Sequence, residues 1–319
     1  MAKCVGQVWL IMQDVWDLTV LLLMTIAAHI RAIYRFFVPP PPKSLVGKVI
    51  LVTGSSGGIG RQICSQLAPK GAVLVCWDVD KRSNDNFVKD LVDKTGVKAF
   101  SYQVDVSDRS HVQTVLQKVR QDVGDINIVI NNAGIMPCKP FLNNTPEELE
   151  KLFQVNVLAH FWVLQEVLPR MIEVNDGHIV TTCSATGLIP TRNLAAYSGT
   201  KHAVHGFLEA LKEELRHDSR KPDIKFTTVY PFACSTGLLS GIRSYSRFPF
   251  IVDTVLQPEE VAEKLIDGLQ RNYEHIYIPN FIRFAGTTAK CLLPEVQRLA
   301  ADFMGCYVEP ISTDARKMK

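Results

Sequence analysis

Between residues 48 and 279, short apolar runs alternate with stretches in which apolar side chains recur at helical spacing. Short runs bounded by turn residues are typical of strands buried on both faces, and the intervening spacing is typical of amphipathic helices. The runs that we expect as strands are 48–52, 73–77, 98–104, 126–130, 178–182, 225–230 and 276–278. Regular alternation of strand and helix predicts right-handed βαβ units. The expected fold is therefore α/β, a doubly wound parallel sheet of about seven strands.

Two long helices are expected in the second half of this region. The first begins at Thr145-Pro146-Glu147-Glu148, which has the pattern of a capping box with proline at the first helical position, and it runs to about Arg170. The second runs from Tyr197 to His217, with an apolar stripe along one side.

The amino-terminal segment carries a separate apolar run, Leu18–Ile30, that has no formal charge and continues to Val38. Twenty-one residues suffice to cross a bilayer as a helix. A cleaved signal peptide, a buried core helix and a membrane anchor are the alternatives, and we favour the anchor, spanning the bilayer or lying in its interface. Arg31 and Arg35 lie near its carboxyl end, which places the remaining chain in the cytosol. Residues 39–42 are four prolines, a stiff spacer that ends the helix.

These boundaries divide the chain into an anchor and linker at 1–43, a main domain at 44–280 and a carboxyl-terminal extension at 281–319. Within the main domain, 234–257 is rich in apolar residues without clear periodicity. This stretch is either a mobile cover over an apolar substrate or a loop packed on the core or the bilayer. The extension is also apolar, and either covering the site or touching a membrane would account for it.

The composition of the chain argues against several classes of function. The net charge of +3 over 319 residues is too small to indicate nucleic-acid binding. The eight cysteines are scattered without metal-ligand spacing, so we expect a reducing compartment and no metal site.

A glycine-rich loop, TGSSGGIG at residues 53–60, lies between the first expected strand and a helix. Glycine at Gly54, Gly58 and Gly60 lets the backbone turn tightly and approach a pyrophosphate, which the free N–H groups of the helix then bind. Glycines also simply make turns, but the strand–loop–helix context favours a dinucleotide site.

The second expected strand ends in Asp78, 24 residues after Gly54. A carboxylate at this spacing accepts hydrogen bonds from ribose hydroxyls and repels a 2′-phosphate, which favours NAD over NADP. Lys81 and Arg82 follow closely and could soften that preference.

Tyr197 and Lys201 are four residues apart, so on a helix they lie on one face. An ammonium this close is expected to lower the pKa of the phenol and suit it to proton transfer. Ser184 follows an apolar run that would deliver its hydroxyl to the same place. Alone this pattern is weak, because tyrosine and lysine one turn apart are common on exposed helices.

The motifs together resemble a short-chain dehydrogenase/reductase: TGxxxGxG at 53–60, NNAG at 131–134, Asn156, Ser184, and YxxxK at 197–201. The match covers about residues 46–279 and implies a Rossmann-type fold and an active NAD(P)-dependent enzyme.

The resemblance also implies roles for individual residues. Tyr197 would be the general acid/base, Ser184 would hold the substrate oxygen, Lys201 would bind the nicotinamide ribose, and Asn156 would support a relay water. The cofactor residues that it implies are Gly54, Ser56, Gly58, Ile59, Gly60, Asp78, Asp105, Val106, Asn132, Ala133, Gly134, Tyr197, Lys201, Pro231 and Thr236.

One departure from the family's usual motifs indicates which branch of the family this chain resembles. The family usually has Pro-Gly after its sixth strand, whereas this chain has Pro231-Phe232. Together with the amino-terminal apolar run, this is similar to a membrane-associated branch that holds retinol and 17β-hydroxysteroid dehydrogenases of the endoplasmic reticulum and lipid droplets.

The leading hypothesis is thus an NAD-dependent oxidoreductase for a lipophilic alcohol such as a retinoid, steroid or fatty alcohol, facing the cytosol from the reticulum membrane or a lipid droplet. A reductase of 3-ketoacyl thioesters and a surface protein with a vestigial nucleotide fold are the alternatives. The family commonly dimerises through the two long helices that here carry Asn156 and Tyr197, so a homodimer is compatible with the sequence.

Overall fold

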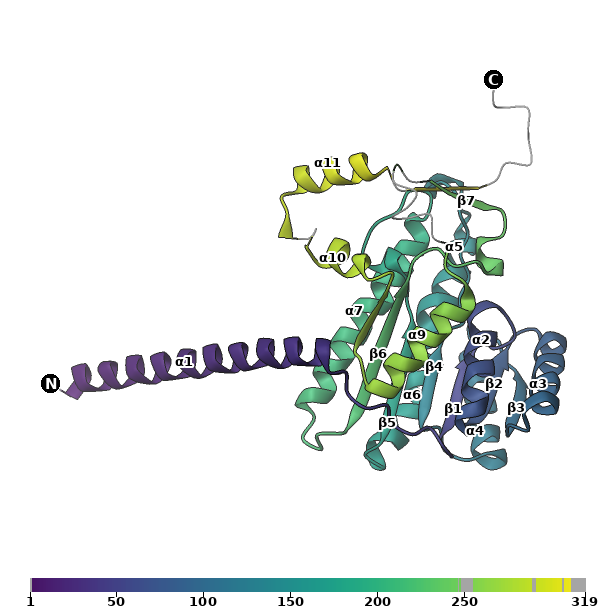
Figure 1. Ribbon diagram of the computed structural model, residues 1–319, viewed down its shortest axis with the longest axis horizontal. Coiled ribbons are helices and arrows are strands. Elements are labelled where there is room, and N and C mark those ends of the chain that lie inside the picture. Colours follow the sequence, from purple (N-terminus) through teal and green to yellow (C-terminus); the bar gives the residue numbers. More distant parts are fainter. Residues whose placement is uncertain (1, 246, 248–254, 289–290, 306, 311–319) are drawn as a thin grey trace, which may run out of the picture. The chain divides into compact units, whose positions relative to one another are not determined.

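The computed structural model describes residues 2–245, 247, 255–288, 291–305 and 307–310 (Figure 1). The chain divides into two compact units, Met1–Lys43 and Ser44–Lys319, which are described separately.

The first unit is a single helix, α1 (Ala2–Phe37), followed by the proline linker. It begins much earlier than the expected Leu18, because the preceding residues are also mostly apolar helix formers and an exposed helix accommodates Asp14 and Asp17 on its surface. The hydroxyl of Thr25 donates a hydrogen bond to the Leu21 carbonyl within the helix, at 2.8 Å. Residues 12–37 are long and apolar enough to cross a membrane, and none of that stretch is buried within the protein.

The second unit contains the seven-stranded sheet. Its strands are β1 (Val49–Thr53), β2 (Val73–Asp78), β3 (Ala99–Gln103), β4 (Ile128–Asn131), β5 (Gly177–Thr182), β6 (Ile224–Pro231) and β8 (His275–Ile278). Their order is β3-β2-β1-β4-β5-β6-β8, and every adjacent pair is parallel. This confirms the predicted doubly wound sheet, and each strand lies within a few residues of its expected position.

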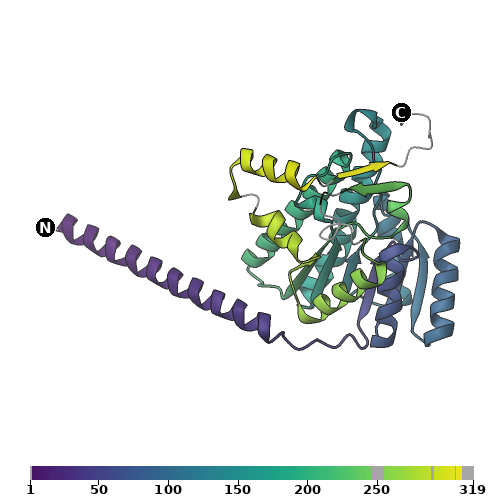
Figure 2. The same cartoon turned by 45° about the horizontal axis from the view of Figure 1, so that its top comes forward.

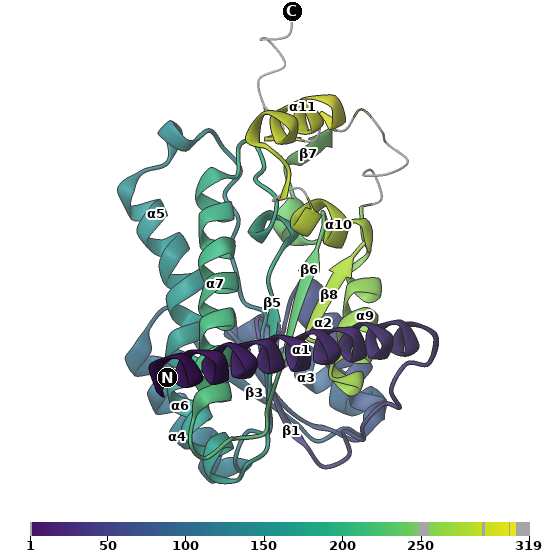
Figure 3. The same cartoon turned by 90° about the vertical axis from the view of Figure 1, so that its left-hand side faces the viewer.

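Helices cover both faces of this sheet (Figures 1 and 3). One face packs on α2 (Gly58–Leu67), α3 (Lys81–Thr95) and α9 (Pro258–Arg271). The other packs on α4 (Arg109–Asp122), α6 (Ala159–Glu173) and α7 (Ala195–His217). Because both faces are buried, β1, β2 and β4 are mostly apolar rather than alternating, whereas β5 and β6 also bury polar side chains such as His178 and Thr227. Short 3₁₀ turns occur at 68–70, 141–143, 185–187 and 237–239.

The helix expected from Thr145 to about Arg170 is not continuous. The capping box forms as predicted and begins α5 (Pro146–Phe153), but a π-helical turn at Gln154–Leu158 separates α5 from α6. The extra residue in this turn rotates the chain, which brings Asn156 inward to a fully buried position.

A smaller layer lies beyond the carboxyl ends of the strands. It consists of β7 (Ile242–Tyr245), α10 (Phe281–Thr288), α11 (Pro294–Met304) and β9 (Tyr307–Pro310), with β7 and β9 paired antiparallel (Figure 2). The stretch 234–257 was expected to lack regular structure, yet it supplies β7. Residues 246 and 248–254 of that stretch lie outside the described residues, as do 311–319 of the extension.

Candidate active site

The glycine-rich loop connects β1 to α2 in a conformation that its glycines require. Gly54 and Gly58 have φ of +65° and +46°, where L side chains are strained. A Cβ on Gly60 would lie 2.0 Å from the Gly54 carbonyl oxygen. Helix α2 then begins without a side-chain cap at Gly57, so its first N–H groups are available to an anion. These features fit a dinucleotide phosphate.

Asp78 ends β2 beside this loop. Its carboxylate accepts hydrogen bonds from the Ser56 N–H at 3.0 Å and the Asp80 N–H at 3.1 Å. The side chain is therefore fixed at the end of its strand next to the loop, where the sequence predicted a ribose-binding carboxylate.

The residues after β3 and β4 lie at the same edge of the sheet. Asn132 donates its side-chain N–H to the carbonyls of Thr53 at 3.1 Å and Gly54 at 3.3 Å, which fastens the NNAG segment to the glycine-rich loop. Asp105 accepts from the Ser107 N–H at 2.9 Å and pairs with Lys151 at 3.1 Å. The side chain of Val106 is buried in the core, so only its backbone remains available for a cofactor.

Tyr197 and Lys201 occupy one face of α7, as their spacing predicted. Both side chains are buried, and the Lys201 Nζ lies 5.6 Å from the centre of the Tyr197 ring. The Lys201 ammonium donates to the Thr182 carbonyl at 3.1 Å. Ser184 lies two residues beyond that carbonyl, with its hydroxyl near enough to the Tyr197 hydroxyl to lower the pKa of the phenol. The structure therefore brings the three predicted groups together.

The predicted direction of the Tyr197 pKa shift is wrong for this structure. Burial raises the pKa of Tyr197 above its usual value and the Cys183 thiol adds to the rise, whereas the nearby Ser184 hydroxyl opposes it. Burial also lowers the pKa of Lys201. Spacing alone indicated a cation near the phenol, but removing both groups from water outweighs the attraction between them.

Asn156 contacts the same group of residues from the π-helical turn. It accepts from the Ile135 N–H and donates to the Ile135 carbonyl, both at 2.9 Å, and it donates to Thr200 Oγ1 at 3.2 Å. Thr200 in turn donates to the Tyr197 carbonyl at 2.7 Å. Thr200 was not identified from the sequence, although its place beside Lys201 was a signal.

His160 was also missed. It lies four residues after Asn156, is 3% exposed, and its Nδ1 has no hydrogen-bond partner among the described residues. Burial, with a contribution from Lys201, lowers the pKa of His160 to about 3, so the imidazole is neutral at physiological pH. The i, i+4 spacing from Asn156 is the sequence signal that could have identified it.

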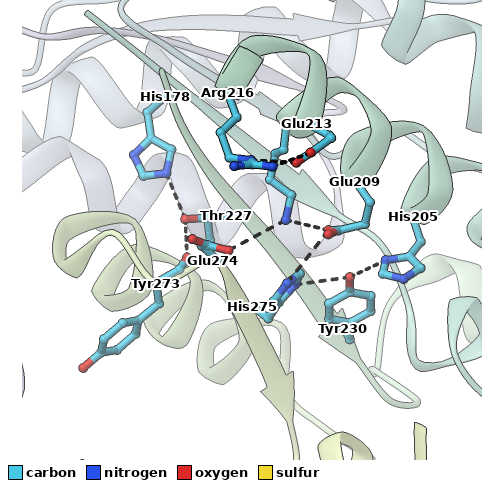
Figure 4. Close-up of polar contacts among 11 residues, drawn as sticks. His178, His205, Glu209, Glu213, Arg216, Thr227, Tyr230, Tyr273, Glu274 and His275 are labelled. Carbon is cyan, nitrogen blue, oxygen red and sulfur yellow. Dashed lines mark hydrogen bonds and ion pairs between the residues drawn. The ribbon is translucent and has the colours of Figure 1, made fainter. Parts of the chain in front are cut away.

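A polar cluster holds α7 against the edge of the sheet (Figure 4). Tyr230 of β6 shares its hydroxyl with His205 Nδ1 at 2.8 Å and His275 Nδ1 at 3.5 Å, and Glu209 of α7 lies 3.9 Å from His275 Nε2. Burial raises the pKa of Tyr230, so its hydroxyl stays protonated. The cluster fixes the helix on which Tyr197 is carried.

The segment after β6 approaches the glycine-rich loop. Pro231 is the last residue of β6, opposite Ile278, and the following Phe232 N–H donates to the Ile278 carbonyl at 2.8 Å. A Cβ on Gly58 would lie 3.0 Å from Thr236 Cγ2, so Thr236 contacts the start of α2. Thr236 and the loop thus lie together, as the motif spacing predicted.

A cavity of about 540 Å³ opens beside these residues, between the segment after β4, helix α5 and the β7–β9 layer. Its lining is mainly apolar and includes Ile135, Met136, Leu238, Ile242 and Pro310. Met136 also packs against the cluster that contains Tyr197. The cavity and the phenol therefore share a wall.

Comparison with known proteins agrees with this architecture. The family profile of short chain dehydrogenases matches residues 48–246. Human 17-beta-hydroxysteroid dehydrogenase 13 is 34% identical over 90% of this chain and 96% of its own length. Mouse epidermal retinol dehydrogenase 2 is 34% identical over 93% of this chain and 94% of its own. A short-chain dehydrogenase from Sphingobium yanoikuyae, solved in complex with NADPH, superposes with a TM-score of 0.67 and 26% identity over 80% of this chain and 96% of that one.

The doubly wound sheet and the glycine-rich loop at its switch point define a dinucleotide-dependent oxidoreductase. The chain belongs to the short chain dehydrogenase family. Its resemblance to the retinol and 17β-hydroxysteroid dehydrogenase branch is confirmed.

Proposed function

We propose that this protein interconverts a lipophilic alcohol and its carbonyl compound, with Tyr197 as the group that moves the proton. The observation that carries the proposal is the grouping of half-buried Ser184 with buried Tyr197 and Lys201, together with Met136, which contacts the Tyr197 cluster and also lines a mainly apolar cavity. Relatives named for retinol and hydroxysteroids support the same substrate class. A nicotinamide dinucleotide, when bound, supplies or accepts the hydride.

Each side chain has a distinct part in the proton transfer. Ser184 and Tyr197 lie near each other, and both present hydroxyls to the substrate oxygen. In carbonyl reduction Tyr197 donates its proton to that oxygen, and in alcohol oxidation the ionised phenol takes the proton back. Asn156 and Thr200 hold the backbone around Tyr197.

The raised pKa of Tyr197 gives this scheme a pH dependence. A neutral phenol is the form that reduction needs, whereas oxidation needs the phenolate. The rate of alcohol oxidation should therefore keep rising with pH above neutrality, whereas the rate of carbonyl reduction should stay constant until the pH approaches this raised pKa.

The test uses full-length protein in detergent with retinol, a hydroxysteroid, a fatty alcohol and a 3-ketoacyl thioester. We expect turnover of at least one of the three alcohols, and Tyr197→Phe should lower it about a thousandfold or more while the cofactor Kd changes little. Unchanged turnover in Tyr197→Phe would overturn the assignment. Turnover of the thioester alone would favour the ketoacyl alternative.

We infer that NAD is preferred over NADP. Asp78 supports this, because a carboxylate fixed beside the phosphate loop repels a 2′-phosphate. The same residues would hold the cofactor in either case: the loop 54–60, Asp78, Asp105 and Val106, the segment 132–134, and Pro231 with Thr236.

We also infer that α1 anchors the protein in the membrane of the endoplasmic reticulum or on a lipid droplet, with the catalytic unit in the cytosol. The exposed apolar surface of residues 12–37 supports this, as does the internal bonding of Thr19 and Thr25, whose hydroxyl protons are satisfied by carbonyls of the same helix. Full-length protein should stay with membranes in alkaline carbonate, and a chain lacking residues 1–43 should be released.

We further propose a homodimer formed through the surfaces of α6 and α7. The rings of Phe161 and Phe207 stack at 3.9 Å between these helices, and both remain partly exposed. Light scattering of the purified protein, compared with a Phe207→Glu variant, would test this arrangement.

A further inference from the structure

The Tyr197 side chain is covered in this structure. It is 8% exposed and lies in a cluster with Leu152 and Leu194, against which Met136 and Val308 pack. A substrate oxygen must reach the Tyr197 hydroxyl for the proposed reaction to occur. At least one part of this cover must therefore lie against the substrate or move aside for it.

The four side chains that cover Tyr197 differ in how firmly the rest of the protein holds them. Leu152 and Leu194 are buried residues of the main unit, and Met136 closely follows β4. Val308 belongs to β9, which among the described residues pairs only with β7, in a two-stranded sheet separate from the main sheet. Two-stranded ribbons have little stability of their own. Val308 is thus the part of the cover that is least fixed by the core.

Side-chain contacts fasten β9 over the site. Asn193, which precedes α7, donates to the Val308 carbonyl at 2.7 Å. Arg192 pairs with Glu309 at 3.2 Å and lies 4.9 Å from the centre of the Tyr307 ring. Burial raises the pKa of Cys138 in the cavity wall and the charge of Glu309 adds to it, which agrees with β9 lying beside that wall.

The strand also reaches the cavity. Pro310 lines it, together with Ile242 of β7. Alternate residues of a strand lie on the same face, so Val308 and Pro310 share one face of β9. That face extends from the Tyr197 cluster at Val308 to the cavity at Pro310.

We propose that β9 is a wall of the alcohol site and that Val308 is a specificity-determining residue, which rests on the function proposed above. The apolar body of the alcohol lies along the face of β9 that carries Val308 and Pro310, with its oxygen at Tyr197. The size of residue 308 then sets how bulky an alcohol can be next to the reacting carbon. The carboxyl-terminal extension, rather than the main sheet, selects the substrate.

The experiment compares kcat/KM of the full-length protein for a small alcohol, cyclohexanol, and for the bulkiest alcohol that it turns over. Val308→Trp should lower kcat/KM for the bulky alcohol about tenfold or more relative to cyclohexanol, and Val308→Ala should shift the ratio in the opposite direction. The cofactor Kd should stay within about twofold of the parent value, because the contacts given above for β9 are with β7, Arg192, Asn193 and the Tyr197 cluster, and Tyr197 is the one predicted cofactor residue among them. The control is Leu293→Trp, an equally large change at a residue of the same extension that is 72% exposed.

A second pair of variants tests the contact that holds β9 in place. Glu309→Arg should change the substrate ratio, and the charge exchange Arg192→Glu with Glu309→Arg should restore it. A ratio that is the same in all Val308 and Glu309 variants, while Tyr197→Phe still abolishes turnover, would overturn the inference and leave the proposed function intact. Turnover that survives Tyr197→Phe, or no alcohol turnover at all, would overturn both.

Discussion

The cofactor side and the proposed substrate side of the active site are built from different kinds of structure. The cofactor side consists of strand ends and tight backbone turns, and the strands behind it, such as β1 and β4, are almost completely buried. The proposed substrate side includes an isolated two-stranded ribbon. The helices α10 and α11 belong to the same layer beyond the strand ends, and among the described residues α11 has none that is buried.

This difference determines how far the amino-acid sequence of each region can change. A backbone site in a packed sheet admits few changes, because glycines such as Gly54 and Gly60 have close neighbours. A ribbon held by a few side-chain contacts can change its sequence without disturbing the core. If β9 selects the substrate as proposed, the fold keeps hydride and proton transfer fixed and leaves substrate choice to a region of low intrinsic stability.

The largest expected effect comes from the glycine-rich loop. In Gly60→Ala, the new Cβ would lie 2.0 Å from the Gly54 carbonyl oxygen, so the backbone of the loop must move. We expect a stability loss of about 3 kcal/mol and a cofactor Kd raised about a hundredfold, measured by thermal unfolding and by fluorescence titration with NADH.

Gly57→Ala is the matched control for this prediction. Gly57 has an ordinary φ of −127° and no heavy atom within 4 Å of its added Cβ. It should bind cofactor almost as well as the parent protein. Equal affinity in both variants would show that the cofactor side is no more rigid than the substrate side.

The next effect concerns His160, which lies behind the catalytic residues. Its pKa of about 3 in the folded protein is below the ordinary value of 6.5, so acid protonates the unfolded chain first and stability falls as pH decreases from about 6.5 towards 3. Between pH 7 and pH 5 this histidine alone should cost about 2 kcal/mol.

His160→Gln should remove that part of the pH dependence, measured as the free energy of unfolding in urea at several pH values. Val163→Ala, at a buried site one turn further along α6, should lower the free energy of unfolding by the same amount at every pH. The slope of that free energy against pH should therefore stay that of the parent protein. A slope that persists in His160→Gln would mean that the histidine is not held neutral in the core.

The same contrast explains what could be predicted from the sequence. The strands, the phosphate loop and the grouping of Ser184, Tyr197 and Lys201 followed from local patterns, because in a parallel sheet consecutive strand ends meet at one edge. The ribbon could not be predicted, since β7 and β9 are 62 residues apart at their nearest and pair through a contact that neither stretch encodes alone. The predicted direction of the Tyr197 pKa shift was wrong for a similar reason, because the burial of this side chain depends on residues distant in the sequence, such as Leu152.

A smaller effect is expected at the cofactor's ribose. Asp78→Asn keeps a side chain of the same shape but removes the charge, so the preference for NAD over NADP should fall about tenfold, measured as the ratio of the two Kd values. Asp80→Asn removes a charge two residues away and keeps an oxygen for the Ser83 N–H that Asp80 caps. If both substitutions change the ratio equally, the preference reflects general charge rather than the contact at Asp78.

The smallest effect on stability is expected on α11, where an exposed leucine can be compared directly with a buried one. Leu299 is 64% exposed, so Leu299→Ala should change the free energy of unfolding by less than about 0.5 kcal/mol. Leu265→Ala, the same substitution at a fully buried position of α9, should cost about 3 kcal/mol, because it removes packing against the sheet and leaves a cavity. Urea unfolding of the chain lacking residues 1–43 would measure both. A large loss in Leu299→Ala would mean that α11 is packed in solution against a surface that makes it part of the core, and the substrate side would then be as fixed as the cofactor side.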